Sequence, residues 1–191
     1  MRPRLWTAAA VLAMSASSAM PALAQEGRSP AMPHVLTVSD TAQADAALAH
    51  RIAERVRRYV NYTIFDDVNL TVNNGLVTLY GRVTQPYKAK DLARIVSRVN
   101  GVLEVNNELG VLPVSIHDDR LRSSLAQQIY RDPVFSGYAI HVNPPIHIIV
   151  ERGQVTLTGA VNSLVERQKA EVIARSTFGV FNVENRLRID S

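Results

Sequence analysis

The chain has 191 residues, of which 47% are hydrophobic, and it contains no cysteine. This composition suits a soluble globular protein and excludes disulfides and thiolate metal sites. The formal net charge of +4 includes Arg2 and Arg4, so it falls to about +2 if the first residues are removed, and it does not by itself indicate nucleic-acid binding. The 6% aromatic content, without a basic-aromatic sheet pattern, also argues against nucleic acid.

The first 24 residues have the form of a signal peptide. Arg2 and Arg4 precede a short apolar run, Leu5 to Met14, and Ala22-Leu23-Ala24 has the small-x-small form of a signal-peptidase site. The apolar run is too short to span a bilayer. We therefore predict cleavage after Ala24 and a periplasmic product. Residues 25–43, which contain two prolines and a glycine, are predicted to be a flexible leader.

The rest of the chain contains an internal repeat. Gly75-Leu76-Val77-Thr78-Leu79-Tyr80-Gly81 returns as Gly153-Gln154-Val155-Thr156-Leu157-Thr158-Gly159, at an offset of 78 residues (153 − 75), and Asn107 returns as Asn185. An offset that holds over such a span indicates two copies of one folded domain. Because glycine permits turns and Asn107 lies in phase with apolar strand residues, we expect the repeated residues to be structural, with the asparagine bonded to a nearby backbone group.

Each copy predicts the order helix, strand, strand, helix, strand. In the first, we expect a helix from about Asp45 to Tyr59 and a hairpin around Asn73-Asn74-Gly75. A second helix, capped by Thr84, should span Pro86 to Val99, and a strand should follow from Val102 to Val111.

The second copy repeats this order, with Asn162 as the cap of its second helix and Val165, Val172 and Ile173 pointing inward. Its first helix matches at an offset of 73, which places extra residues within Gly137–Pro145. We predict an α+β protein with two tandem αββαβ domains, each a small three-stranded mixed sheet with two helices on one face. The last strand should run parallel to the second. The domains are placed at 44–112 and 118–191, joined by a linker at 113–117.

The order of elements, their spacing and the two strings Gly153-Gln154-Val155-Thr156-Leu157-Thr158-Gly159 and Gly179-Val180-Phe181-Asn182-Val183-Glu184-Asn185 resemble the BON domain family. The resemblance covers roughly residues 45–112 and 118–190. It implies a periplasmic location, a role in envelope maintenance under stress, and phospholipid binding without catalysis. The family offers no catalytic or ligand motif to carry over, and the leader of residues 25–43 departs from its pattern.

The sequence offers no catalytic constellation. No cysteine exists and no serine lies in a G-x-S-x-G elbow. The five histidines have no counterparts between the copies, and Asp66-Asp67 and Asp118-Asp119 lack calcium-loop spacing. Asp118-Asp119 precedes a helix, where carboxylates favourably meet the helix dipole. We therefore expect no enzyme activity, no metal, no cofactor and no small-molecule substrate.

Two basic stripes stand out in the first domain. Each recurs at helical spacing, so its members share one helix face; the first is Arg51, Arg55 and Arg58, and the second is Lys90, Arg94 and Arg98. Such stripes suit anionic lipid headgroups, and ordinary solvated helix faces are the alternative. In the second domain, Tyr130, Val134 and Phe135 either contact lipid or complete the core.

These features lead to two functional hypotheses. The first is a non-enzymatic periplasmic protein that binds anionic phospholipid at the membrane surface and supports the envelope under osmotic stress. The second is a protein-interaction or chaperone-like adaptor for an envelope protein, without lipid affinity. The adaptor would use exposed sheet faces, which we expect at Asn69, Thr71, Thr78 and Tyr80 and at His147, Ile149, Thr156 and Thr158.

Overall fold

The computed structural model describes residues 38–190, which belong to one compact unit, Leu36–Ser191. The predicted signal peptide, its cleavage site and the first part of the leader lie outside the described residues. Helix α1 spans Val38–Arg57, so it begins before Asp45, and the end of the predicted leader is helical. The alanine-rich run Ala42, Ala44, Ala46 and Ala47 explains the extension, because alanine is the best helix former.

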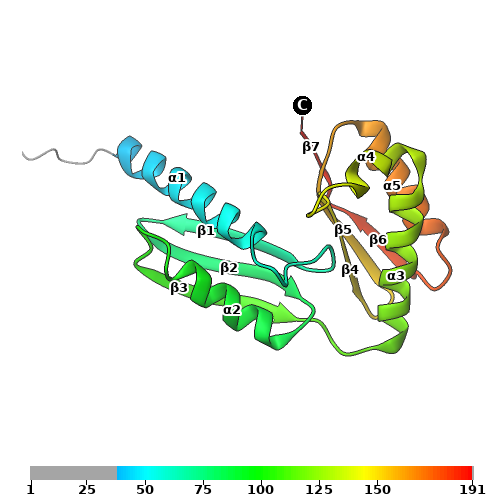
Figure 1. Ribbon diagram of the computed structural model, residues 1–191, viewed down its shortest axis with the longest axis horizontal. Helices are drawn as coiled ribbons and strands as arrows, with labels where there is room; N and C mark the ends of the chain where they lie inside the picture. Colours follow the sequence, from blue (N-terminus) through cyan, green and yellow to red (C-terminus); the bar gives the residue numbers. More distant parts are fainter. Residues whose placement is uncertain (1–37, 191) are drawn as a thin grey trace, which may run out of the picture. The chain divides into compact units, whose positions relative to one another are not determined.

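The first domain has the predicted αββαβ order (Figure 1). Strands β1 (Asp67–Asn73) and β2 (Leu76–Val83) are antiparallel, and β3 (Glu104–Val111) lies parallel to β2 at the edge of the sheet. Helix α2 spans Pro86–Val96. Its N-cap is Gln85 rather than Thr84, because the Thr84 hydroxyl instead donates to the Asp66 carboxylate at 3.0 Å.

The second domain repeats this order with two changes. Helix α3 (Ile116–Arg131) is followed by a 3₁₀ turn η1 (Pro133–Phe135) and a short helix α4 (Ser136–Ala139), which lie in and beside the region where extra residues were expected. Strand β4 (Ile146–Glu151) pairs antiparallel with β5 (Gln154–Val161), and α5 spans Leu164–Ser176. The last strand is divided into β6 (Asn182–Asn185) and β7 (Arg188–Ile189), both parallel to β5.

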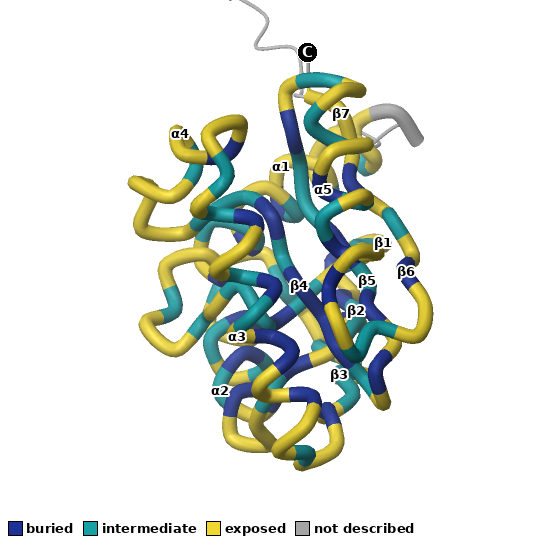
Figure 2. The backbone as a smooth tube through the Cα atoms, turned by 90° about the vertical axis from the view of Figure 1, so that its right-hand side faces the viewer, coloured by how far each residue is buried: buried dark blue, intermediate teal, exposed yellow. Residues whose placement is uncertain are grey.

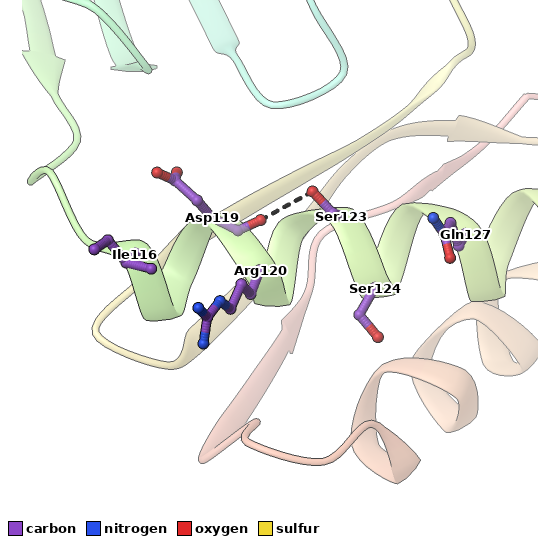
Figure 3. Close-up of a pocket in the computed structure, with 6 residues that line it drawn as sticks. All are labelled: Ile116, Asp119, Arg120, Ser123, Ser124 and Gln127. Carbon is purple, nitrogen blue, oxygen red and sulfur yellow. Dashed lines mark hydrogen bonds between the residues drawn. The ribbon is translucent and has the colours of Figure 1, made fainter.

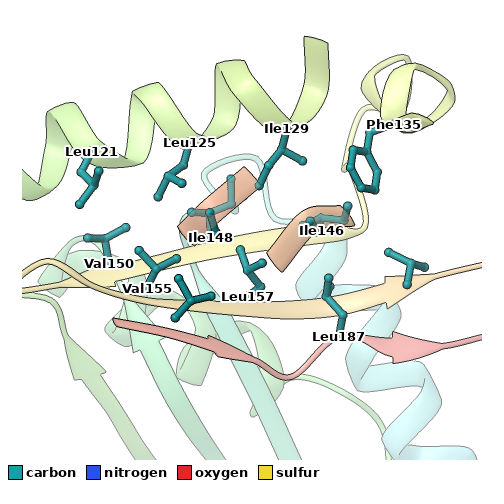
Figure 4. Close-up of a cluster of buried hydrophobic side chains, with 14 residues drawn as sticks. Leu121, Leu125, Ile129, Phe135, Ile146, Ile148, Val150, Val155, Leu157 and Leu187 are labelled. Atoms are coloured by element: carbon teal, nitrogen blue, oxygen red, sulfur yellow. The ribbon is translucent and has the colours of Figure 1, made fainter. Parts of the chain in front are cut away.

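Each domain has its own apolar core on one face of its sheet. In the first, Ile52 of α1 and Leu92 of α2 pack with Leu79 of β2, which places both helices on the same face. In the second, Leu125 and Ile129 of α3 meet Leu157 of β5 (Figure 4). Phe135, in the 3₁₀ turn after α3, is fully buried and completes this core, whereas Val134 beside it is 43% exposed.

The inward face of α5 differs from the prediction. Val165 and Val172 are 70% and 61% exposed, whereas Ala170 and Ala174 are fully buried. Residues two apart on a helix point about 200° apart, so Val172 and Ala170 lie on nearly opposite faces. The small alanines face the sheet and let the helix pack against it, and Asn162 is not the cap, since Ser163 accepts the N–H of Glu166. Ile173, the third predicted residue, does pack against the core.

The repeated asparagines hold the last strand to the second helix, as predicted. Asn107 Nδ2 donates to the carbonyl of Ala89 at 3.1 Å, and its Oδ1 accepts the N–H of Leu109. Asn185 makes the equivalent pair of bonds, to the carbonyl of Arg167 and from the N–H of Leu187. A side chain that satisfies two backbone groups in both copies explains why the fold uses it twice.

Aspartates on the first helices bind the hairpin turns. The carboxylate of Asp45 accepts the N–H groups of Asn74 and Gly75, and the carboxylate of Asp118 accepts those of Arg152 and Gly153, both at 2.9 Å. The turn residues have positive φ, as a tight hairpin turn requires. Asp118 therefore binds the turn, in addition to lying at the helix start where the sequence placed it.

The outer face of the second sheet is not exposed as the adaptor hypothesis expected. Ile149 and Thr158 are only 6% and 7% exposed, and β4 is largely buried along its length (Figure 2). The segment before β1 and the first residue of β1 account for part of this burial. The N–H of Ile148 donates to the Ile64 carbonyl at 2.7 Å, and the Thr158 hydroxyl donates to Asp67 at 3.0 Å.

The corresponding face of the first sheet remains open: Asn69, Thr71 and Tyr80 are exposed there. In the described part of the chain, no helix has the length and apolar character needed to cross a membrane.

Candidate membrane-binding surface

Helices α1 and α2 lie side by side in opposite directions. Arg51 of α1 donates to the carbonyl of Asn100, after the end of α2, at 3.2 Å. The Tyr59 hydroxyl, after the end of α1, donates to Asp91 in the middle of α2 at 2.8 Å. The two basic stripes therefore occupy neighbouring helices. We call this set, Arg51, Arg55, Arg58, Lys90, Arg94 and Arg98, the cationic helix pair.

All six side chains of the cationic helix pair are exposed. Arg58 pairs with Glu54 at 3.1 Å and Arg94 pairs with Asp91, but these arginine side chains remain 75% and 61% exposed. Exposed ion pairs contribute at most about 1 kcal/mol, so they hold the cations weakly. Within residues 38–190, Arg55, Lys90 and Arg98 make no side-chain hydrogen bond or ion pair. The surface thus presents six cations against the two carboxylates of Glu54 and Asp91. Its net charge is positive, which a binding site for anions requires.

The structure also reveals an aromatic loop that sequence reasoning missed. The segment Thr177–Phe181 joins α5 to β6, and its Phe178 and Phe181 are 99% and 79% exposed. The backbone of this loop is fixed: Gly179 has a positive φ, and the N–H of Phe181 donates to the carbonyl of Gly153 at 2.9 Å. Two exposed phenylalanines on a fixed loop form an apolar tip, which favours contact with a partner or a membrane.

The repeat itself carries the signal for this loop. At the offset of 78, Phe178 corresponds to Asn100, beside Gly101. Because Asn100 is exposed to solvent in the first domain, the phenylalanine at the equivalent position of the second domain is expected to be exposed as well. Exposed basic residues accompany the tip, since Arg175 lies in the last turn of α5 and Arg152 in the hairpin turn that Phe181 contacts.

A shallow polar depression lies along α3 (Figure 3). Its volume is about 490 Å³, and all its lining residues come from this one helix: Ile116, Asp119, Arg120, Ser123, Ser124 and Gln127. The Ser123 hydroxyl donates to the carbonyl of Asp119 at 3.0 Å, a bond within the helix that supplies no activating base. Among residues 38–190, no group of three or more His, Asp or Glu side chains is arranged to hold a metal ion.

The sequence of both domains matches a known family model. The BON domain family model matches residues 44–113 and again residues 117–191, so the chain belongs to the BON domain family. Its two copies are the two αββαβ domains described above.

One similar protein is Osmotically-inducible protein Y of Escherichia coli (strain K12). It is 27% identical over 131 residues, covering 64% of this chain and 61% of that protein. The chain therefore spans less than two thirds of the length of this relative.

Among solved structures, two of CdsD, a structural protein of the type III secretion system of Chlamydia trachomatis, are similar. The first has a TM-score of 0.27 and 14% identity, covering 76% of this chain and 94% of that one. The second, its C-terminal domain, has a TM-score of 0.26 and 13% identity, covering 74% and 96%. At these scores the likeness carries no argument about function.

Proposed function

We propose that the protein is a non-enzymatic, peripheral binder of anionic phospholipid membranes, located in the periplasm and supporting the cell envelope under osmotic stress. The observation that carries the lipid proposal is the cationic helix pair. The name of the Escherichia coli relative supports the osmotic part, since that protein is osmotically inducible.

Electrostatic attraction supplies the first part of the binding. Each lysine or arginine near an anionic membrane surface contributes about 1 kcal/mol, so six cations suffice for reversible association at low salt. Because exposed charges are screened over about 10 Å at 0.1 M ionic strength, the association should weaken as salt is added.

The aromatic loop supplies an apolar contribution. Phe178 lies almost wholly in solvent, and transferring such a ring into the acyl boundary gains about 1.5–3 kcal/mol. Arg175 and Arg152 carry positive charge in the adjoining segments. An exposed apolar tip beside cations is the combination that peripheral membrane proteins use at an interface.

Vesicle co-sedimentation tests the lipid proposal. The protein beginning at Gln25 should sediment with phosphatidylglycerol vesicles at low salt and should not sediment with phosphatidylcholine vesicles. Absence of binding to phosphatidylglycerol vesicles would refute the proposal.

Charge reversal tests the assignment to the helix pair. The triple variant Arg51→Glu, Arg55→Glu, Arg58→Glu should lose most binding. A matched variant, Arg120→Glu, Arg131→Glu, Arg188→Glu, makes the same charge change at exposed positions of the second domain and should retain it. Equal loss in both would show a response to net charge rather than to the helix pair.

Location has its own test. Expression of the full chain in a bacterial host, followed by osmotic shock and N-terminal sequencing, should release a product that begins at Gln25. Recovery of the uncleaved chain from the cytoplasm would contradict the proposed location without bearing on the lipid affinity.

A further inference from the structure

A groove runs between α2 and β3 in the first domain. It has a volume of about 430 Å³ and is lined by Ala93, Arg94, Ser97, Val102, Leu103, Glu104 and Val105. Most of its lining is small or apolar, and Leu103 at its side is 77% exposed. Among residues 38–190, β3 pairs only with β2, so within this part of the chain one edge of the strand lies open along this groove.

The second domain closes the equivalent place. At the offset of 78, Ala93 and Ser97 correspond to Glu171 and Arg175. The Glu171 carboxylate pairs with Arg175 at 2.8 Å and accepts a hydrogen bond from Asn185 at 3.2 Å, so these side chains lie between α5 and β6. The edge strand there is also interrupted, since β6 ends at Asn185 and β7 starts at Arg188. The first domain alone combines small groove residues with an eight-residue edge strand.

The backbone of β3 limits where a partner can pair. The N–H of Leu109 is already bonded to the Asn107 side chain at 3.3 Å, which occupies the far part of the edge. The available part runs from about Leu103 to Asn107, beside the groove. An unpaired edge of this kind accepts an added strand through main-chain hydrogen bonds.

The side chains of β3 define what would fit. Val105 and Leu109 pack toward the core under α2, whereas Glu104 and Glu108, which alternate with them, are exposed on the other face. An added strand would alternate in the same way. One set of its side chains would meet Ala93, Ser97 and Leu103, and the other set would lie beside the two glutamates.

We propose that the groove between α2 and β3 binds an extended peptide segment, which adds to the sheet as a strand beside β3. Small apolar side chains of the peptide enter the groove, and basic side chains on its other face pair with Glu104 and Glu108. The site goes beyond the proposed lipid function, because it uses the sheet edge and carboxylates rather than the cationic helix pair, with which it shares only Arg94.

Designed peptides test this directly. The probe is an acetylated, amidated Gly-Val-Lys-Val-Lys-Val-Gly peptide, added to the ¹⁵N-labelled protein beginning at Gln25. Backbone amide signals of Leu103–Asn107 and of Ala93 and Ser97 should shift, while those of the equivalent residues 171–185 should not. Two controls replace both lysines with glutamate or the central valine with proline; the first loses charge complementarity and the second cannot complete the strand pairing.

A variant pair taken from the repeat sharpens the test. Ala93→Glu with Ser97→Arg transplants the groove-filling pair of the second domain and should weaken binding by about tenfold or more, a large effect on this scale. Because the second domain folds with this pair, we expect the variant to fold, which circular dichroism checks. If it does not fold, the single variants Glu104→Lys and Glu108→Lys, at exposed positions, take its place with the same expected loss.

The inference is overturned if the lysine peptide does not bind, if it shifts residues outside the groove, or if the filled-groove variant binds it unchanged. Vesicle binding is measured on the same variants. The filled-groove variant retains Arg94, so its vesicle binding should be unchanged, and loss of peptide binding there separates the groove from the lipid surface. Peptide binding that persists in the Arg51, Arg55, Arg58 triple variant supports the groove even where lipid binding fails.

Discussion

The ammonium group of Lys88 lies 2.6 Å from the carboxylate of Asp66, and both side chains are almost completely buried. The carboxylate also accepts hydrogen bonds from the backbone N–H and the hydroxyl of both Thr63 and Thr84. Burial alone would raise the pKa of Asp66, but the hydrogen bond from Lys88 and those from Thr84 and Thr63 outweigh it and lower the pKa. The second domain has Glu166 in place of Lys88, so this pair belongs to the first domain alone.

Removing the charge of Asp66 should be strongly destabilising. Asp66→Asn leaves Lys88 buried without its counter-charge, which costs about 3–5 kcal/mol in comparable sites. Urea unfolding at pH 7 measures the loss. Glu184→Gln, which breaks an exposed pair with Arg186, is the control and should change stability by less than about 1 kcal/mol. Equal effects of the two substitutions would contradict the assignment.

The lowered pKa of Asp66 also predicts how the stability of the fold changes at acid pH. Because its folded pKa lies below the ordinary value of 3.8, Asp66 stabilises the fold fully above that value. The contribution is lost as the pH falls through the folded pKa. Lys88→Met removes the partner, so the difference in unfolding free energy between wild type and this variant should shrink as the pH is lowered below about 4. A constant difference from pH 7 to pH 2 would count against this origin.

His147 predicts a second pH effect, nearer neutrality. The centre of its ring lies 5.3 Å from that of Tyr62, and its buried Nδ1 has no hydrogen-bond partner among the residues that the structure describes. Burial lowers the pKa of His147 below 6.5, although the Asp66 and Thr63 backbones and the charges of Asp67 and Asp66 oppose the shift. The folded state then binds fewer protons than the unfolded state just below pH 6.5, so stability should fall as the pH drops through this range.

Unfolding measured at pH 7.5 and at pH 5.5 tests the assignment. His147→Gln should flatten the dependence between these values, whereas His50→Gln and His141→Gln, at exposed positions, should leave it unchanged. If the dependence survives His147→Gln, the titrating group lies elsewhere.

The two carboxylates that bind the hairpin turns from the first helices should contribute unequally to stability. Asp118 is 1% exposed and holds two turn amides, so Asp118→Ala should cost about 3 kcal/mol, because hydrogen bonds to a buried charge are strong. Asp45 makes the same contacts at a more exposed place, and Asp45→Ala should cost about 1 kcal/mol. Thermal unfolding of both variants checks the order, and a larger effect at Asp45 would contradict it.

The aromatic loop can be tested with a fluorescent reporter. The single tryptophan of the chain, Trp6, lies in the predicted signal peptide, so the protein beginning at Gln25 has none. Phe178→Trp should show emission at shorter wavelength when phosphatidylglycerol vesicles are added, because the indole leaves water. Ile140→Trp, at an 83% exposed position of another loop, should show little change. Equal shifts, or none, would remove the loop from the membrane surface.

The repeat made the architecture predictable from sequence. Strand alternation, the turn at Gly75 and Gly153, and the asparagines at Asn107 and Asn185 all follow from patterns that occur twice. The inward face of α5 did not follow, because Val172 is more hydrophobic than Ala170, while close packing against the sheet favours the smaller side chain. The cationic stripes were visible as helical spacing, and their use in lipid binding stays a prediction.

Other features depended on tertiary contacts that spacing does not encode. The buried pair of Asp66 and Lys88 joins residues 22 positions apart in the sequence. The repeat gave no indication of it, because the other copy has Glu166 at the position of Lys88. Phe181 belongs to one of the two strings that resemble the family pattern. Its ring lies beside Gly153, so close that a Cβ at this position would meet the ring, and yet it stays 79% exposed.

Asn107 bonds to α2 through Ala89 and to β3 through Leu109, so the helix cannot shift along the strand without breaking one of these bonds. The groove between α2 and β3 therefore keeps the same width before any partner binds. A groove whose backbone is preorganised in this way lowers the entropy cost of binding a peptide, most of all for a segment that is already extended.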